Sequence, residues 1–231
     1  MILFLLLWYL MDLAKWYFDI VGYNIIWTFD DNKNDITIGY SKFNKNIYLT
    51  IDDVVNNDSF EEILDVLEEF NAKATFFVIS SLVNEKNKEL LSRAVKSGHH
   101  LANHGKTNCK HFLCTNNRLY NEIMDCEKLI EEIYIFNNKP LPKIKYFRPG
   151  SGFVTKNITI ICESNNYKIV LGSVYPQDTK FPFPNLIYYY IKLKVKPNDI
   201  IILHDRKFTP SVLKKTLRYL KKNNYNIKSL E

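Results

Sequence analysis

The 231-residue chain lacks several features by which protein classes are recognised from sequence. It has neither a G-x-G-x-x-G loop nor a G-x-x-x-x-G-K-[ST] loop, which argues against nucleotide binding. Its formal net charge is only +6 and its lysines are scattered without interleaved aromatic residues, so we expect no nucleic-acid partner. Its 7 glycines and 8 prolines are few beside 15 tyrosines and 15 phenylalanines, a composition that favours a globular core over disorder.

Cysteine is scarce, and its spacing is not that of a metal-binding or disulfide framework. The four cysteines, Cys109, Cys114, Cys126 and Cys162, include no C-x-x-C pair. Reduced thiols are therefore the expected state. Two alternatives stay open: a disulfide between Cys109 and Cys114, and Cys109 as a soft metal ligand beside the neighbouring histidines.

No apolar run is long enough to span a bilayer by itself. The first eleven residues, MILFLLLWYLM, are uncharged, but Asp12, Lys15 and Asp19 interrupt the stretch that follows. The segment also lacks the basic start and small-residue cleavage site of a signal peptide. Residues 1–29 are expected either to associate with a membrane or to form a helix on the domain. The compartment, with the secretory pathway as one option, and the oligomeric state stay open.

From residue 46 onward, short β-rich runs alternate with longer helical stretches, which predicts six or seven βα repeats. Strands are expected at 46–52, 73–80, 99–104, 144–149, 167–174, 199–205 and 225–231. Helices are expected at 59–70, with Ser59 as N-cap, and at 84–98, 116–136, 156–166, 183–195 and 210–224. Without a glycine-rich dinucleotide loop, this pattern favours a distorted (β/α) barrel of about seven strands. We therefore predict one barrel domain at 46–231 after an apolar, irregular segment at 1–45.

Polar residues stand where the predicted strands end. In chain order they are Asp52, Asp53, His104, Arg148, Asp178, His204 and Asp205. In a βα barrel the carboxyl ends of the strands form one rim, and catalytic groups gather there. Each residue alone has a structural explanation, such as a helix cap, an ion pair or a buried histidine. Their occurrence at successive strand ends favours an active site.

The segments that carry these residues resemble the motifs of the polysaccharide deacetylases, the family-4 carbohydrate esterases that include chitin and peptidoglycan N-deacetylases. LTIDDV resembles the T-F-D-D motif, and GHHLANHGKTN resembles G-H-E-x-x-N-H-[ST]-x-x-H. FRPGSGF resembles the arginine-proline motif, IIILHD the L-x-H motif, and VLGSVYPQD the stretch with a tuning aspartate. Order and spacing agree from about Ile47 to the end of the chain.

The resemblance implies a metal-dependent amide hydrolase that removes acetyl groups from an acetylated amino-sugar glycan. It assigns Asp52 as the general base that activates water and His204 as the acid that protonates the departing amine. Arg148 would position Asp52. Asp178 would orient His204.

For the metal site, the resemblance assigns Asp53 and His104 as ligands of a divalent ion, expected to be zinc. Asn108 stands where the family has its second histidine, and an amide oxygen is a weaker zinc ligand than imidazole. Three alternatives stay open. Asn108 completes a weaker site that takes zinc or another transition metal; His111 reaches in from a loop, although a helix would put it roughly 10 Å away; or no metal binds. In the last case the chain is a metal-independent hydrolase of small amides or a non-catalytic glycan-binding pseudoenzyme.

Overall fold

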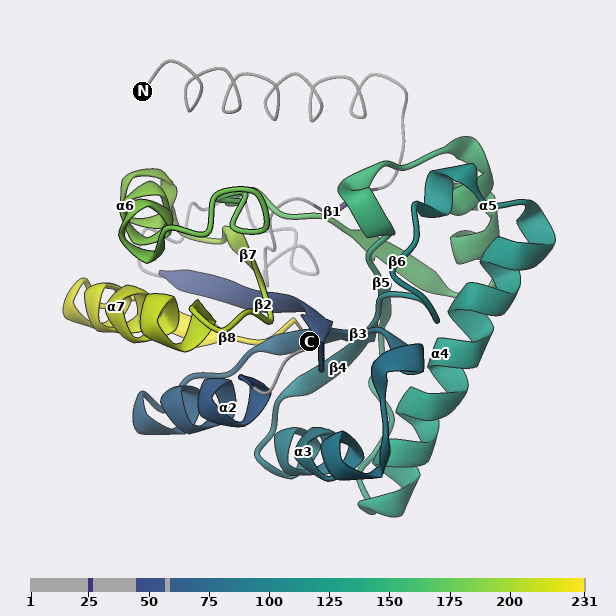
Figure 1. Cartoon of the computed structure of the whole chain (residues 1–231), viewed down its shortest axis with the longest axis horizontal. Helices are drawn as coiled ribbons and strands as arrows, with labels where there is room; N and C mark the ends of the chain where they lie inside the picture. Colours follow the sequence, from purple (N-terminus) through teal and green to yellow (C-terminus); the bar gives the residue numbers. More distant parts are fainter. Residues whose placement is uncertain (1–24, 27–44, 57–58, 231) are drawn as a thin grey trace, which may run out of the picture.

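The computed structural model describes residues 25–26, 45–56 and 59–230 (Figure 1). The expected N-terminal segment at 1–45, with its candidate membrane-associated stretch at 1–29, lies almost wholly outside these residues. The boundary at residue 46 stays a prediction for the same reason. No helix in the described ranges is long and apolar enough to cross a membrane.

The described strands form one parallel sheet that curls into a barrel-like layer. They are β1 (Ile25–Ile26), β2 (Asn46–Val54), β3 (Thr75–Val78), β4 (His100–Asn103), β5 (Lys145–Phe147), β6 (Tyr167–Val170), β7 (Ile200–His204) and β8 (Asn226–Lys228). Their order is β1-β6-β5-β4-β3-β2-β7, with β8 also paired to β2. An isolated bridge from Val174 to Ile201 places the segment after β6 beside β7. The sheet therefore curls toward closure, which confirms the predicted (β/α) barrel architecture.

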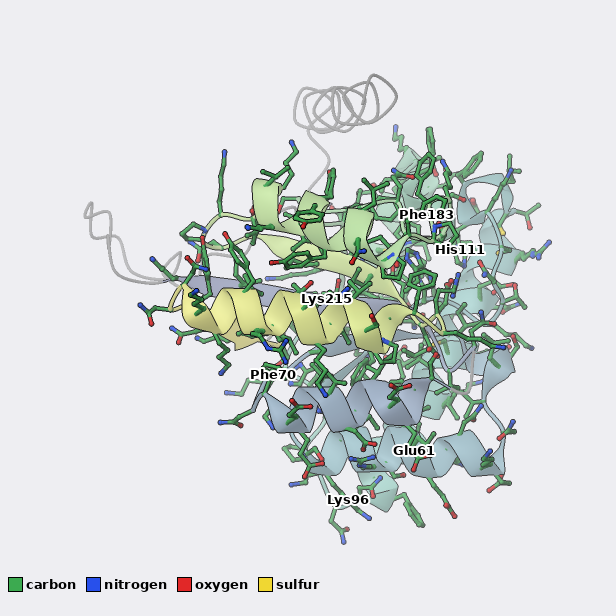
Figure 2. The ribbon with its side chains drawn as sticks, turned by 60° about the vertical axis from the view of Figure 1, so that its left-hand side comes forward. Glu61, Phe70, Lys96, His111, Phe183 and Lys215 are labelled. Carbon is green, nitrogen blue, oxygen red and sulfur yellow. The ribbon has the colours of Figure 1, made fainter. Side chains whose placement is uncertain are left out.

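Helices cover the outside of the sheet (Figure 1). They are α2 (Phe60–Glu69), α3 (Glu85–Lys96), α4 (Asn116–Phe136), α5 (Lys156–Ser164), α6 (Pro184–Lys194) and α7 (Thr209–Lys222), with short 3-10 turns η1 (Ser80–Leu82), η2 (His111–Leu113) and η3 (Gly150–Gly152). Charged residues such as Glu61, Lys96 and Lys215 lie on their exposed faces (Figure 2). Every predicted helix from residue 59 onward is present, with ends that differ by a few residues.

Successive strand residues pack on opposite sides of the sheet. Phe76 belongs to the core between sheet and helices, whereas its neighbour Phe77 belongs to a smaller cluster inside the barrel. The inner cluster contains Tyr48, Phe77, Ala102, Tyr146, Val170, Ile200 and Leu230. A barrel whose interior is filled by side chains is a packed core and not a pore. Chemistry is therefore confined to the rim.

Two local predictions need correction. The first strand is expected to end at Asp52, but β2 runs on to Val54, so Asp53 also lies inside it, with a left-handed φ of 58°. Ser59 does precede α2, but its side chain makes no cap hydrogen bond. The Ser59 hydroxyl instead donates to Asp205 Oδ1 at 2.6 Å, so a tertiary partner outcompetes the local N-cap.

We expect Phe76→Ala to lower the free energy of unfolding by about 3–5 kcal/mol, because it leaves a cavity under α2. Phe76 is fully buried and meets Phe60 edge to face at 4.9 Å. Phe136→Ala is the matched control, since Phe136 is 78% exposed at the end of α4. Urea unfolding measures both variants, and equal losses would contradict this account of the core.

Candidate active site at the barrel rim

The carboxyl ends of β2, β4, β5 and β7 bring the predicted residues together. Asp52 on β2 is the register partner of His204 on β7. His104 directly follows β4, and its Nδ1 lies 2.6 Å from the carbonyl oxygen of Arg148, which directly follows β5. Adjacent parallel strands place their carboxyl ends side by side, so residues far apart in sequence meet at this rim.

The carboxylate of Asp52 is held by a buried arginine. Arg148 Nη1 donates to Asp52 Oδ1 at 2.5 Å and to Thr50 Oγ1 at 2.9 Å. Its Nε and Nη2 donate to the carbonyl oxygens of Val170 and Leu171. Burial lowers the pKa of Arg148, although the charge of Asp52 opposes that shift. A buried cation with this many partners fixes the orientation of Asp52.

His204 and Asp178 form a second pair. Asp178 Oδ1 lies 2.8 Å from His204 Nδ1, and its Oδ2 accepts the backbone N–H of His204 at 2.8 Å. A carboxylate accepts hydrogen bonds, so Nδ1 carries a proton and Nε2 is the atom left for chemistry. Burial alone would lower the pKa of His204, but the charge of Asp178 and the hydrogen bond to it raise that pKa. His204 therefore holds its second proton to higher pH than an ordinary histidine.

His104 has the tautomer that a metal ligand needs. Its Nδ1 faces a carbonyl oxygen, which only accepts, so this nitrogen carries a proton. In a neutral ring Nε2 then has a free lone pair, and it lies 3.5 Å from Asp53 Oδ1. Two ligands about 2.1 Å from one zinc ion lie roughly 3.4 Å apart at the tetrahedral angle. Metal-binding histidines typically donate their other N–H to a carbonyl or carboxylate.

Asp53 also has a cationic partner that the sequence did not reveal. Arg206 Nη2 donates to Asp53 Oδ2 at 2.6 Å. Burial alone would raise the pKa of Asp53. The hydrogen bond and charge of His104 when its ring is protonated, the charge of His204 and the hydrogen bond from Arg206 lower this pKa well below its usual range. Arg206 directly follows the IIILHD stretch, and nothing in its spacing marks its partner.

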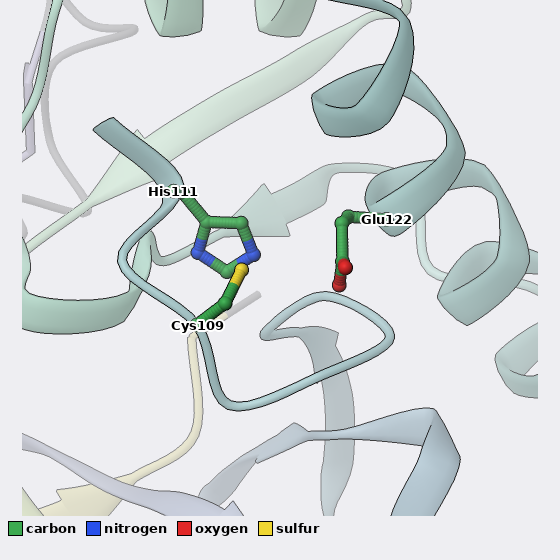
Figure 3. Close-up of side chains that lie close together, drawn as sticks. All are labelled: Cys109, His111 and Glu122. Atoms are coloured by element: carbon green, nitrogen blue, oxygen red, sulfur yellow. The ribbon is translucent and has the colours of Figure 1, made fainter. Parts of the chain in front are cut away.

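Three other ligand-type side chains converge beside the rim. Within the described residues, one trio of His, Cys, Asp or Glu places its ligand atoms within 4.8 Å of one another: Cys109, His111 and Glu122. Figure 3 shows them approaching from the loop after β4 and from α4. Glu122 is already engaged by the backbone N–H and the hydroxyl of Thr107, at 2.7 and 2.8 Å.

His111 has the opposite tautomer from His104. Its Nδ1 accepts the backbone N–H of Gly150 at 2.7 Å, so in the neutral ring Nε2 carries the proton. Burial and the charge of His104 lower the pKa of His111 to about 4, which keeps the ring neutral. A protonated Nε2 has no lone pair for a metal. His111 and its two neighbours therefore fit a structural cluster better than a metal site.

The loop that carries Asn108 and His111 packs closely against the turn that follows Arg148. A Cβ at Gly150 would lie 2.1 Å from the carbonyl oxygen of Cys109, so only glycine fits there. The segment between His104 and His111 is not helical, and the helical distance expected between these histidines does not apply. Asn108 has an exposed side chain.

The rim fits a divalent ion through two of its predicted ligands. Asp53 Oδ1 and the lone pair of His104 Nε2 face each other at ligand separation, and both residues are about 95% buried. No third His, Cys, Asp or Glu of the described chain joins them in a ligand group. Asn108 stays a prediction as the third ligand.

We expect nitrogen-15 NMR of labelled histidine at neutral pH to show opposite tautomers. His104 should carry its proton on Nδ1 and His111 on Nε2, because one faces a carbonyl and the other a backbone N–H. Addition of Zn²⁺ should then perturb Nε2 of His104 and leave Nε2 of His111 protonated. An Nδ1-protonated His111 would overturn the assignment and return the trio to the metal candidates.

Comparison with known proteins finds similar chains among glycan deacetylases. The chain is 30% identical over 187 residues to a peptidoglycan-N-acetylglucosamine deacetylase of Bacillus cereus, covering 78% of this chain and 84% of the relative. It is 29% identical over 159 residues to a chitooligosaccharide deacetylase of Sinorhizobium fredii, covering 69% and 71%.

Solved structures show the same fold at low sequence identity. A crystal structure of a peptidoglycan N-acetylglucosamine deacetylase superposes with a TM-score of 0.77 at 21% identity, covering 93% of this chain and 94% of the other. A CE4-family pseudoenzyme from Bacillus anthracis gives 0.72 at 22% identity, covering 81% of this chain and 64% of the other. The family model described as polysaccharide deacetylase matches residues 39–170, more than half of the sequence. The chain therefore belongs to the polysaccharide deacetylase family.

Proposed function

We propose that this polysaccharide deacetylase hydrolyses the N-acetyl amide of an acetylated amino-sugar glycan, chitin-like or peptidoglycan-like. A divalent metal, zinc by preference, would be held by Asp53 and His104, with Asn108 as predicted third ligand. The observation that carries the proposal is the pairing of Asp52 with His204 across β2 and β7. A proton acceptor and a proton donor on adjacent strand ends, beside a ligand pair, are what amide hydrolysis needs.

Asp52 acts as the general base. Water must lose a proton as it attacks the acetyl carbon, and Asp52 is a carboxylate whose Oδ1 is held by Arg148. Arg148 aims the base and does not touch the reacting atoms. When bound at Asp53 and His104, the metal would polarise the acetyl carbonyl and offset the charge that develops on its oxygen.

His204 acts as the general acid. The sugar amine leaves only when its nitrogen gains a proton, and His204 Nε2 is the atom that can supply it because Nδ1 is held by Asp178. The C–N bond then breaks, and the products are acetate and a glycan with a free amine. A raised pKa lets the ring hold this proton to higher pH than an ordinary histidine would.

One second candidate has a specific observation in its favour. The exposed Asn108 leaves the ion with two ligands from the described residues, and the fold is shared with a pseudoenzyme. Under this alternative the protein binds glycans without turnover. Oligosaccharide binding without acetate release, at saturating Zn²⁺ or Co²⁺, would support it over the hydrolase.

The hydrolase is tested by acetate release from chitooligosaccharides and from an N-acetylated peptidoglycan fragment, with added divalent metal. We expect Asp52→Asn and His204→Ala each to lower the rate by about 10²- to 10⁴-fold, the usual contribution of general acid–base catalysis. Asp65→Asn is the matched control, because Asp65 lies on the exposed face of α2, where it pairs with Arg93. Unchanged turnover in Asp52→Asn would remove the base assignment.

The pH profile tests the His204–Asp178 pair separately. As the general acid, His204 must be protonated, so kcat/KM is full below its pKa and falls as pH rises through it. Asp178→Asn removes the charge that raises this pKa, and we expect the alkaline limb to move to lower pH. A limb that stays in place, with the variant folded by circular dichroism, would show that His204 is not the titrating acid.

A further inference from the structure

We propose that Arg206 is an internal cation that competes with the metal for Asp53. The inference rests on the proposed metal site at Asp53 and His104. It assigns to Arg206 a positioning part in that site. The guanidinium neutralises Asp53 when no ion is bound and weakens the hold on an ion that arrives.

The guanidinium of Arg206 is held in place by two hydrogen bonds. Nη2 donates to Asp53 Oδ2 at 2.6 Å, while Nη1 donates to the backbone oxygen of Asp205 at 2.8 Å. The second contact fixes the plane of the guanidinium on the carboxylate. Asp205 is itself fully buried and is held by the hydroxyl of Ser59. The side chain of Arg206 is 23% exposed, so it has a path to solvent.

The two oxygens of Asp53 are divided between two partners. Oδ2 belongs to Arg206, and Oδ1 faces the lone pair of His104 Nε2 at 3.5 Å. An ion at Oδ1 would therefore share one carboxylate with a guanidinium already bonded to its other oxygen. Two cations on one carboxylate repel each other, and in a buried site that repulsion is only weakly screened.

The charges around the rim point the same way. Asp52 is neutralised by Arg148, and Asp178 by His204 when that ring is protonated. Asp53 is the remaining acid of the predicted site, and Arg206 neutralises it. Arg206 thus offsets the charge of the carboxylate that would hold the divalent ion. A zinc site with three protein ligands would tolerate such a neighbour better than one that depends on two.

The same contact has a benefit in the metal-free protein. Asp53 is only 4% exposed, and burying a carboxylate without a partner is costly. Arg206 supplies the partner. The protein is therefore expected to fold with Asp53 already aimed, at the expense of metal affinity.

The test is calorimetric titration of metal-free protein with Zn²⁺ and with Co²⁺, which needs no turnover. We expect Arg206→Gln, which keeps an N–H donor without the charge, to tighten metal binding by about tenfold or more. Arg206→Lys keeps the charge and should bind the metal like the unmodified chain. Arg218→Gln, which removes an equal charge from the exposed face of α7, should leave the affinity unchanged.

Thermal unfolding provides a second readout of the same contact. Without metal, Arg206→Gln should melt at lower temperature than the unmodified protein, and saturating Zn²⁺ should restore it by linkage. Weaker or unchanged metal binding in Arg206→Gln would overturn the competition. If the unmodified protein, Arg206→Gln and His104→Ala all fail to bind metal, the proposed metal site itself is wrong. Normal binding with no effect of Arg206 refutes this inference alone.

Discussion

The buried guanidinium of Arg148 holds the ends of several strands together at the rim. It reaches across from β5 to Asp52 and Thr50 on β2 and to two carbonyls at the end of β6. Its guanidinium carbon lies 3.9 Å from the centre of the Phe77 ring. Removing such a cation from water is costly, and the cost is offset only when each donor has a partner. The side chain therefore ties three strands together at the level where the base must be aimed.

The backbone beside this side chain sets the chemistry of two histidines. The carbonyl of Arg148 puts the proton of His104 on Nδ1, and the N–H of Gly150 puts that of His111 on Nε2. Arg148 and Gly150, two residues of one turn, thus give His104 and His111 opposite tautomers. The Nε2 lone pair of His104 is available to a cation beside Asp53. The ring of His111 is neutral and packs under a loop.

The sequence predicted most of the fold and which polar side chains meet at the rim, because strand ends in a βα barrel converge whatever their separation in sequence. Asp52, Arg148 and His204 could be identified at strand ends and in family motifs before any geometry was known. Arg206 could not, because its partner Asp53 is 153 residues away and the contact depends on how β2 and β7 lie together. Ser59 shows the converse case. The capping rule correctly placed it directly before α2, but its hydroxyl bonds to the distant Asp205 instead of the helix backbone.

The placement of Arg148 also changes how loss of function would be read across relatives. A descendant that stopped turning over substrate would still need Asp52, since without it the barrel would bury an arginine with no counter-charge. Selection for folding alone would preserve this couple. The imidazole of His204 is likewise the side-chain partner of a fully buried acid, Asp178, so a need to fold would retain the proton donor as well as the base.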